Sequence, residues 1–249
     1  MQPKDYKDNF FEYHLKGALA SAEAVIPIVK EYITPVSVID IGCGVGAWLS
    51  VWEKNGANEI TGVDGSYIDH KQLLISENNF IECNLENGYR DNKRYNLVTS
   101  LEVAEHLPGK YAEAFVSSLC GLGNVVLFSA AIPGQEGTMH VNEQYPEYWV
   151  DLFKKNGFAP VDCLRTGIWD DKRIQWWYRQ NMLFFVKENA LSNYPKLNEA
   201  YGKTGNTVLS LVHPELLDYK SKKVGYYESI LDSSKATLKY LLDNFLKKK

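Results

Sequence analysis

The chain has 249 residues, of which 45% are hydrophobic and 23% charged, so a buried core is expected and a disordered chain is excluded. Its 27 basic and 31 acidic side chains give a net charge of −4, which favours a small-molecule partner over nucleic acid. The four cysteines form no C-x-x-C pair, which argues against a cysteine zinc site. The sequence has no apolar run of roughly 18 residues and no signal-peptide pattern at its start, so we expect a cytoplasmic protein without a membrane span.

The first expected element is helical. Apolar residues recur at helical spacing from Phe11 to Val29, although Pro27 should kink or split that helix. We therefore expect residues 1–35 to form an N-terminal helical cap.

From about residue 36, short β-branched runs alternate with helical stretches, which is typical of a mostly parallel sheet covered by helices. The expected strands are residues 36–41, 59–63, 79–83, 95–100, 124–130, 160–164 and 182–186. The expected helices between them are residues 46–55, 111–119 and 146–156. This α/β domain should span residues 36–188.

Residues 189–249 are expected to form a helical C-terminal appendage. Near its end, four apolar side chains at i, i+3, i+4 and i+7 trace one helix face: Leu238, Leu241, Leu242 and Phe245. That face fits packing on the same chain, contact with a membrane surface, or a homodimer formed through this helix.

A glycine-rich turn is the most informative segment. The run V-I-D-I-G-C-G-V-G, residues 38–46, carries a buried strand into closely spaced glycines that open a helix. Such a turn lets the backbone approach a ligand closely. Gly42, Gly44 and Ala47 also satisfy the G-x-G-x-x-A form of the dinucleotide fingerprint, so the turn alone leaves a nicotinamide cofactor open.

Two acids flank this turn. Asp40 precedes the first glycine, where a carboxylate stabilises a cationic ligand or holds the turn but repels a pyrophosphate. Asp64 ends the second expected strand, at a distance from Gly42 that fits a carboxylate binding both ribose hydroxyls. Asp64 fits NAD and S-adenosylmethionine equally, whereas Asp40 favours the cationic cofactor.

With these acids the chain resembles the class I S-adenosylmethionine-dependent methyltransferases. Further matches are E-C-N-L at residues 82–85, Y-N-L-V at 95–98 and S-L-E-V-A-E-H-L at 100–107, so the resemblance covers roughly residues 20–188. It implies a Rossmann-like, seven-stranded, mostly parallel sheet whose last strand is antiparallel. The residues that it implies for S-adenosylmethionine binding are Asp40, Gly42, Gly44, Gly46, Asp64, Gly65, Asn84, Leu85, Leu101 and Glu102. Asn84 and Asn96 depart from the acids usual in that family.

The segment H-V-N-E-Q, residues 140–144, with Tyr148 and Trp149 resembles small-molecule methyltransferases that modify bacterial capsule or lipopolysaccharide sugars or their nucleotide-linked precursors. The resemblance implies methyl transfer to a small anionic acceptor, most simply at oxygen. Two alternatives stay open at this point. One is a non-catalytic S-adenosylmethionine-binding partner subunit, and the other is an NAD-dependent oxidoreductase.

Two of the five histidines are placed for acceptor chemistry, whereas His70 and His213 are expected at the surface. His106 and His140 follow the fourth and fifth strands, at the edge where open α/β sheets bind ligands, so either fits a general base. The expected substrate-binding residues are His14, Asn142, Arg173 and Arg179. The arginines lie among Trp169, Trp176 and Trp177, in a set of residues that suits a phosphorylated sugar or the packing of a last hairpin.

A phosphate or phosphoramidate acceptor would need the arginines but no base, because it is already anionic. A divalent metal site built from Glu102, Glu105, His106 and His140 is conceivable. Glu105 and His106 are adjacent in sequence, which should point them in different directions, so no metal is expected.

Overall fold

A computed structural model describes residues 3–205 and 208–246, with side chains from residue 14 onward except in parts of the last helix. The chain falls into two compact units, Met1–Leu211 and Val212–Lys249. The first unit holds one sheet of seven strands in the order β3-β2-β1-β4-β5-β7-β6. Its strands are β1 Ser37–Ile41, β2 Glu59–Asp64, β3 Phe80–Glu82, β4 Leu97–Leu101, β5 Val125–Ser129, β6 Phe158–Val161 and β7 Leu183–Lys187.

The sheet is mostly parallel. β7 runs antiparallel to both of its neighbours, β5 and β6, and the other paired strands are parallel. This is the Rossmann-like sheet with an antiparallel last strand that the resemblance implied. All seven strands lie within two residues of the expected positions at their starts and within three at their ends.

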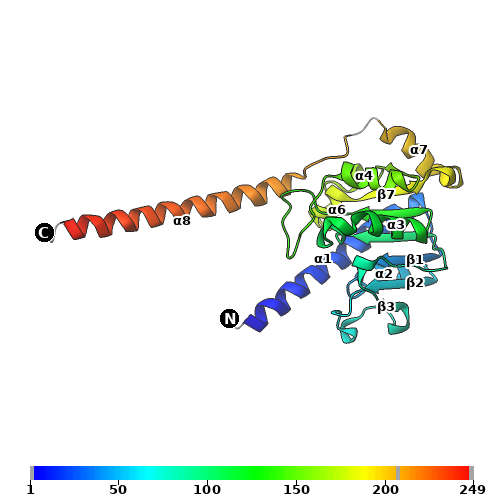
Figure 1. The fold of residues 1–249 in the computed structure, drawn as a ribbon, viewed down its shortest axis with the longest axis horizontal. Coiled ribbons are helices and arrows are strands. Elements are labelled where there is room, and N and C mark those ends of the chain that lie inside the picture. The colour runs from blue at the N-terminus through cyan, green and yellow to red at the C-terminus, as the bar shows by residue number, and fades with distance from the viewer. Residues whose placement is uncertain (1–2, 206–207, 247–249) are drawn as a thin grey trace. The chain divides into compact units, whose positions relative to one another are not determined.

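Helices cover both faces of the sheet, which explains why its central strands are almost continuously apolar. Figure 1 shows the strands with helices on either side, and alternate residues along a strand face opposite layers. Val38 and Leu97 join the core that contains α1 Pro3–Tyr32 and α2 Ala47–Lys54. Ile39 and Val98 join the core that contains α3 Ala112–Leu122 and α4 Pro146–Lys155.

The order of the strands places the site. The chain first builds outward from β1 through β2 to β3 and then returns to the other side of β1 with β4. Ligands of open α/β sheets bind where the strand order reverses in this way, outside the carboxyl ends of the strands. The turn after β1 and the segment after β4 therefore meet at one crevice.

Helix α1 corrects one expectation. Pro27 lies inside a single helix and does not split it. Ala22, Val25, Ile26 and Val29 are all fully buried on one face of this helix. The burial of that face outweighs the one hydrogen bond that a proline removes.

The segment between β6 and β7 also differs from the expected hairpin. It forms two short helices, α5 Arg165–Ile168 and α6 Trp176–Asn181. Ile168, Ile174 and Tyr178 are buried in the same core as α1 and α2. Apolar residues at these spacings suit a helical turn as well as a hairpin, and the packing decides between them.

The first unit continues past residue 188. A 3₁₀ segment, Glu188–Asn193, and helix α7 Pro195–Thr204 belong to it, with Leu197 fully buried. The compact unit that holds the sheet thus extends to Leu211, beyond residue 188, where the α/β domain is predicted to end. The second unit contains α8 Pro214–Leu246, but the side chains of its stripe, Leu238, Leu241, Leu242 and Phe245, lie outside the described residues. No helix within residues 3–205 and 208–246 is long and apolar enough to cross a membrane.

Candidate functional site

The glycine turn after β1 adopts the backbone that only glycine adopts easily. Gly42, Gly44 and Gly46 have φ values of +84°, +55° and +83°. A Cβ on Gly42 would lie 2.4 Å from Val103 Cγ2, and one on Gly46 would lie 3.0 Å from Ile75. A Cβ on Gly44 would meet nothing within 4 Å. Gly42 and Gly46 are thus packed against the protein, whereas Gly44 faces open space.

Asp64 holds this turn in place. One carboxylate oxygen accepts a hydrogen bond from the Gly44 amide at 2.6 Å, and the other accepts from the Gly65 amide at 2.7 Å. The second oxygen also accepts from the Tyr67 hydroxyl. Tyr67 is 80% exposed, and its ring lies so close to Gly65 that a Cβ there would clash with it. An exposed ring is free to move, so a ligand hydroxyl can replace that of Tyr67.

Asp40 lies buried beside the turn. Its carboxylate accepts a hydrogen bond from the Thr99 hydroxyl at 2.6 Å. Burial is the main cause that raises the pKa of Asp40 to about 7; the Thr99 hydrogen bond opposes the shift, and the nearby charge of Asp64 adds to it. A positively charged ligand group nearby would draw the proton off and be stabilised in return.

Together these features fit S-adenosylmethionine. The open face of Gly44 is a cradle that a Cβ would fill, Asp64 offers an acceptor for ribose hydroxyls, and Asp40 is a buried acid suited to a sulfonium. Leu85 and Leu101, which the resemblance also assigned to the cofactor, are both buried at this edge of the sheet.

The two asparagine departures have structural partners. Asn84 caps the 3₁₀ turn Leu85–Asn87, with its carbonyl oxygen accepting from the Glu86 amide at 3.0 Å. Asn96 accepts from the amides of Val36 and Ser37 at the start of β1. Asn96 therefore ties β4 to β1 at the end of the sheet away from the site.

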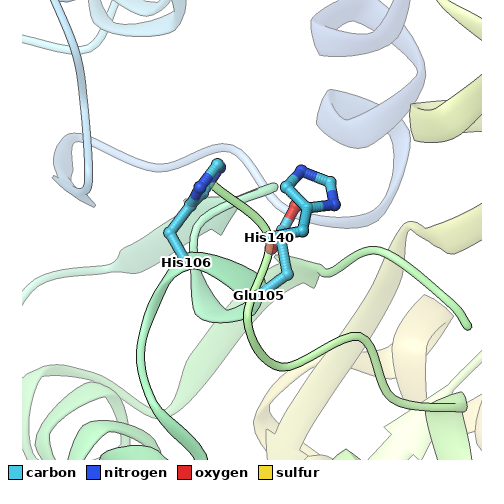
Figure 2. Close-up of side chains that lie close together, drawn as sticks. All are labelled: Glu105, His106 and His140. Atoms are coloured by element: carbon cyan, nitrogen blue, oxygen red, sulfur yellow. The ribbon is translucent and has the colours of Figure 1, made fainter. Parts of the chain in front are cut away.

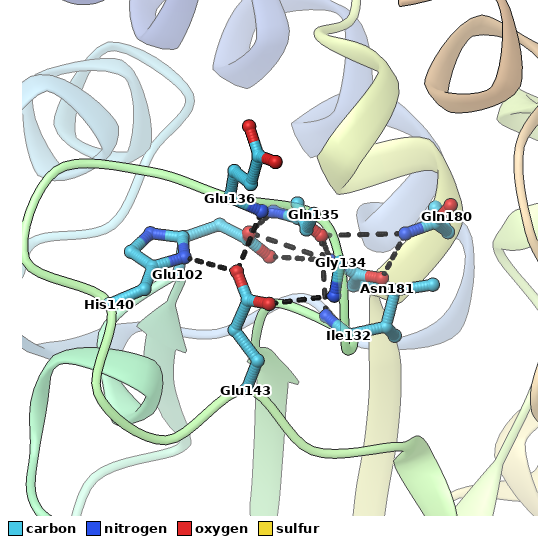
Figure 3. A network of polar contacts seen from close by, with 9 residues as sticks. All are labelled: Glu102, Ile132, Gly134, Gln135, Glu136, His140, Glu143, Gln180 and Asn181. Atoms are coloured by element: carbon cyan, nitrogen blue, oxygen red, sulfur yellow. Dashed lines mark hydrogen bonds and ion pairs between the residues drawn. The ribbon is translucent and has the colours of Figure 1, made fainter. Parts of the chain in front are cut away.

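A polar network follows β4 (Figure 3). The Glu102 carboxylate accepts from Gln135 Nε2 at 2.7 Å and from Asn181 Nδ2 at 3.1 Å. Gln180 donates to Asn181 Oδ1 at 2.9 Å, and Asn181 donates to Gln135 at 2.9 Å. Burial raises the pKa of Glu102, while these amide donors partly reverse the shift. The three amides come from distant segments, and nothing in the sequence pattern marked them.

Glu105, His106 and His140 lie together beside this network (Figure 2). One ligand atom from each residue lies within 4.8 Å of the others, and the two imidazole rings meet edge to face with centroids 4.8 Å apart. Their adjacency in sequence predicts that Glu105 and His106 point apart. The 3₁₀ turn Ala104–His106 instead lets both reach His140, which comes from the loop after β5.

That loop is fixed from both sides. The amides of Val141 and Asn142 both donate to the Glu105 carbonyl, at 2.9 and 3.0 Å. The Glu143 carboxylate accepts from the amides of Gly134 and Glu136, each at 2.7 Å, and from His140 Nδ1 at 2.9 Å. Glu143 is thus the organiser of the loop, a role that its place in the H-V-N-E-Q segment did not reveal.

The electrostatic states of the three residues differ. Burial raises the pKa of Glu105 well above its usual range, and the charge of Glu102 adds to the shift. Partial burial lowers the pKa of His106, and the neighbouring His140 lowers it further, whereas a hydrogen bond to the Met139 carbonyl opposes the change. His106 is therefore neutral at pH 7 and keeps a nitrogen lone pair.

The expected substrate residues are dispersed. Asn142 is buried, and its Nδ2 has no hydrogen-bond partner among the described residues. Arg173 is exposed and paired with Asp171. Arg179 is buried and donates to the Trp169 carbonyl at 2.8 Å. His14 stacks near Trp177, with ring centroids 6.1 Å apart.

Arg165 is likewise structural. It is buried and bridges the Asp162 carboxylate to the carbonyls of Gln180 and Leu209. The basic residues of this region therefore do not converge on one anion site.

Comparison with known proteins shows the family of the chain. A family model described as "Methyltransferase domain" matches residues 11–182. A mitochondrial ubiquinone biosynthesis O-methyltransferase of Dictyostelium discoideum is 32% identical over 88 residues, which are 29% of this chain and 27% of that protein. The match thus spans about a quarter of that relative's length.

Solved structures share the fold. The sugar N-methyltransferase KedS8 from Streptoalloteichus sp. has a TM-score of 0.56 at 14% identity, with 73% of this chain and 92% of that chain covered. Streptomyces venezuelae DesVI has a TM-score of 0.51 at 13% identity, with 75% and 98% covered. At these identities the likeness extends to the fold alone.

Proposed function

Since the chain belongs to the methyltransferase-domain family and is an S-adenosylmethionine-dependent methyltransferase, we propose that it methylates a hydroxyl oxygen of a small anionic sugar or nucleotide-linked sugar. The biological setting that we propose is bacterial capsule or surface-polysaccharide biosynthesis. One observation carries the proposal of a hydroxyl acceptor: Glu105, His106 and His140 gather together, and Glu105 and His106 lie just after Val103, which packs against Gly42 of the glycine turn. The non-catalytic and NAD-dependent alternatives lose their support with the family assignment.

The residues around the glycine turn would hold the cofactor. Gly44 leaves room for it, Asp64 would accept from its ribose, and Asp40 would face its charge. S-adenosylmethionine supplies a methyl group on a positively charged sulfur, which keeps the electrons of the broken carbon–sulfur bond as the acceptor oxygen bonds the methyl carbon. The protein must therefore align the acceptor and remove its proton.

The three clustered residues suit the removal of that proton. A sugar hydroxyl has a pKa far above neutrality, so methylation at pH 7 needs a group that takes or displaces the proton. His106 is partly buried and therefore neutral but can still be reached by solvent, and His140 is oriented by Glu143. Asn142, with its buried Nδ2, lies in the same loop and would donate a hydrogen bond to an acceptor oxygen.

A phosphate or phosphoramidate acceptor is the second candidate, and the arginines are what would favour it. Arg179, however, is buried against the Trp169 carbonyl, and Arg173 is engaged by Asp171. The family relative that matches part of this chain is named as an O-methyltransferase, which accords with an oxygen acceptor. The hydroxyl route is therefore the one that we propose.

The test is a methyl-transfer assay across sugars, phosphorylated sugars and nucleotide-linked sugars, with methylated products identified by mass spectrometry. On the acceptor found, His106→Ala and His140→Ala should each lower turnover by about 10² to 10⁴. Lys203→Ala, which removes only an exposed pair with Glu199, is the control and should leave turnover unchanged. Near-normal turnover in both histidine variants, with a large loss in Arg173→Ala, would instead establish the anionic acceptor.

A further inference from the structure

The cluster of Glu105, His106 and His140 has the composition of a metal site. Two imidazole nitrogens and one carboxylate oxygen lie within 4.8 Å of one another, close enough for a single ion to reach all three (Figure 2). Two histidines with one carboxylate and open positions are a recurrent ligand set for catalytic divalent ions.

Glu105 supplies an independent sign of a ligand. Its side chain is fully buried, and neither carboxylate oxygen has a hydrogen-bond partner among the described residues. The backbone N–H groups of Glu105 and Ala131 are near enough to oppose the rise of its pKa, but neither completes a hydrogen bond to it. Buried carboxylates are normally paired, hydrogen-bonded or bound to a metal, so this one lacks a partner that a cation would provide.

Both histidines are oriented in the way of metal ligands. His140 donates from Nδ1 to Glu143 at 2.9 Å, and His106 donates to the Met139 carbonyl. In each ring one nitrogen is thereby fixed as the donor, which leaves the other with its lone pair. A carboxylate or carbonyl that holds the second nitrogen is the usual companion of a metal-bound histidine.

The backbone around the cluster is strained. The described residues include three non-glycine positions with positive φ, which are Glu102, Glu136 and Met139 at +57°, +61° and +62°. All three lie in the segments that build the cluster and its supporting loop. Strained conformations of this kind persist where the surrounding structure enforces a functional geometry.

We propose that Glu105, His106 and His140 bind one divalent transition-metal ion, such as Zn²⁺, with Glu143 orienting His140 from behind. The ion would keep open positions for water and for the acceptor hydroxyl. Its charge would lower the pKa of a bound hydroxyl, whose proton then leaves to solvent, and hold the oxygen toward the methyl donor. The use of the ion in catalysis rests on the proposed function, whereas its binding does not.

The test is calorimetric titration of ZnCl₂ into the full chain after removal of metals with a chelator. One saturable equivalent is expected. Glu143→Gln should weaken the affinity about 10- to 100-fold, and His140→Ala and Glu105→Gln should weaken it more. The ion should also raise the melting temperature of the wild type but not that of His140→Ala, which checks that the variants are folded.

His70 provides the matched control. It is another described histidine flanked by two carboxylates, with Glu77 and Glu82 at 2.8 and 2.9 Å, so it is the place where adventitious zinc would bind. His70→Ala should leave the titration unchanged. Absence of saturable binding, or binding that His70→Ala abolishes and His140→Ala leaves intact, would overturn the proposal.

The same variants separate this inference from the proposed function. If no metal binds but His140→Ala still abolishes methylation of a hydroxyl acceptor, the metal site fails and the proposed function stands. If zinc binds in the expected pattern and no hydroxyl acceptor is methylated, the metal site stands and the proposed function fails.

Discussion

Asp64 and Glu105 are acids of the same crevice in opposite states. Asp64 follows β2 and accepts from two backbone amides and a tyrosine hydroxyl. Glu105 follows β4 and has no hydrogen-bond partner among the described residues. A carboxylate whose oxygens accept hydrogen bonds from the protein holds the local structure together. A buried carboxylate without such donors is available to bind a ligand. Asp40, which accepts a hydrogen bond from the Thr99 hydroxyl, is intermediate between the two.

The largest effect is expected at Asp40. Its folded pKa of about 7 lies above the ordinary value of 3.8, so the unfolded chain loses this proton first as the pH rises. The contribution of Asp40 to stability is therefore present below about pH 4 and is lost as the pH rises through 7. Relative to the wild type, Asp40→Asn should gain up to about 4 kcal/mol in the free energy of unfolding across that window.

Urea denaturation of cofactor-free protein at several pH values measures this difference. Asp170→Asn is the matched control, because Asp170 is exposed and its replacement should leave the pH dependence unchanged. A gap between Asp40→Asn and the wild type that stays constant with pH would mean that Asp40 is already ionised in the folded protein.

The comparison itself is tested by a pair of isosteric variants. Asp64→Asn places an NH₂ group against a backbone amide and removes a charge-assisted hydrogen bond, so it should lower the free energy of unfolding by about 2–3 kcal/mol. Glu105→Gln breaks no hydrogen bond in the metal-free protein and, by the same linkage as Asp40→Asn, replaces a buried acid whose pKa is raised, so it should not lower the free energy of unfolding. Chelator-treated samples unfolded in urea give both values. The opposite ranking would show that Glu105, too, holds the structure.

The sequence reveals the half of the site that is local. Three positive-φ glycines within five residues, followed by Asp64, leave a pattern in the sequence because each glycine is required by its own backbone. The seven strands are equally visible, since each is short, apolar and bounded by turn residues. Which strands lie side by side follows from the rules for parallel sheets.

The other half depends on contacts between distant segments. Glu105 meets His140 only because its carbonyl accepts from Val141 and Asn142, across a loop that Glu143 shapes. Glu102 accepts hydrogen bonds from Gln135 and Asn181, which come from two further segments of the chain. An amide side chain has no periodic pattern that marks it as part of a network, and adjacency in sequence wrongly suggested that Glu105 and His106 diverge.

The smallest effect is expected at Tyr67, whose hydroxyl occupies one oxygen of Asp64. A ribose that binds Asp64 must displace this hydroxyl. Cofactor binding therefore breaks one hydrogen bond of the ligand-free protein, which weakens the affinity. Tyr67→Phe removes the competitor and should tighten S-adenosylmethionine binding by about 0.5–1.5 kcal/mol, the net value of one hydrogen bond. Calorimetric titration of both proteins measures the change.

Tyr201→Phe, which alters another exposed tyrosine, is the control and should leave the affinity unchanged. Weaker binding in Tyr67→Phe would mean that the hydroxyl joins the bound ribose and does not compete with it. In that case Asp64 is not satisfied by the protein alone, because the tyrosine is part of the cofactor site. Tighter binding would mean that the exposed ring stands in for the ribose until the cofactor arrives, which accounts for a carboxylate that both supports the glycine turn and binds a ligand.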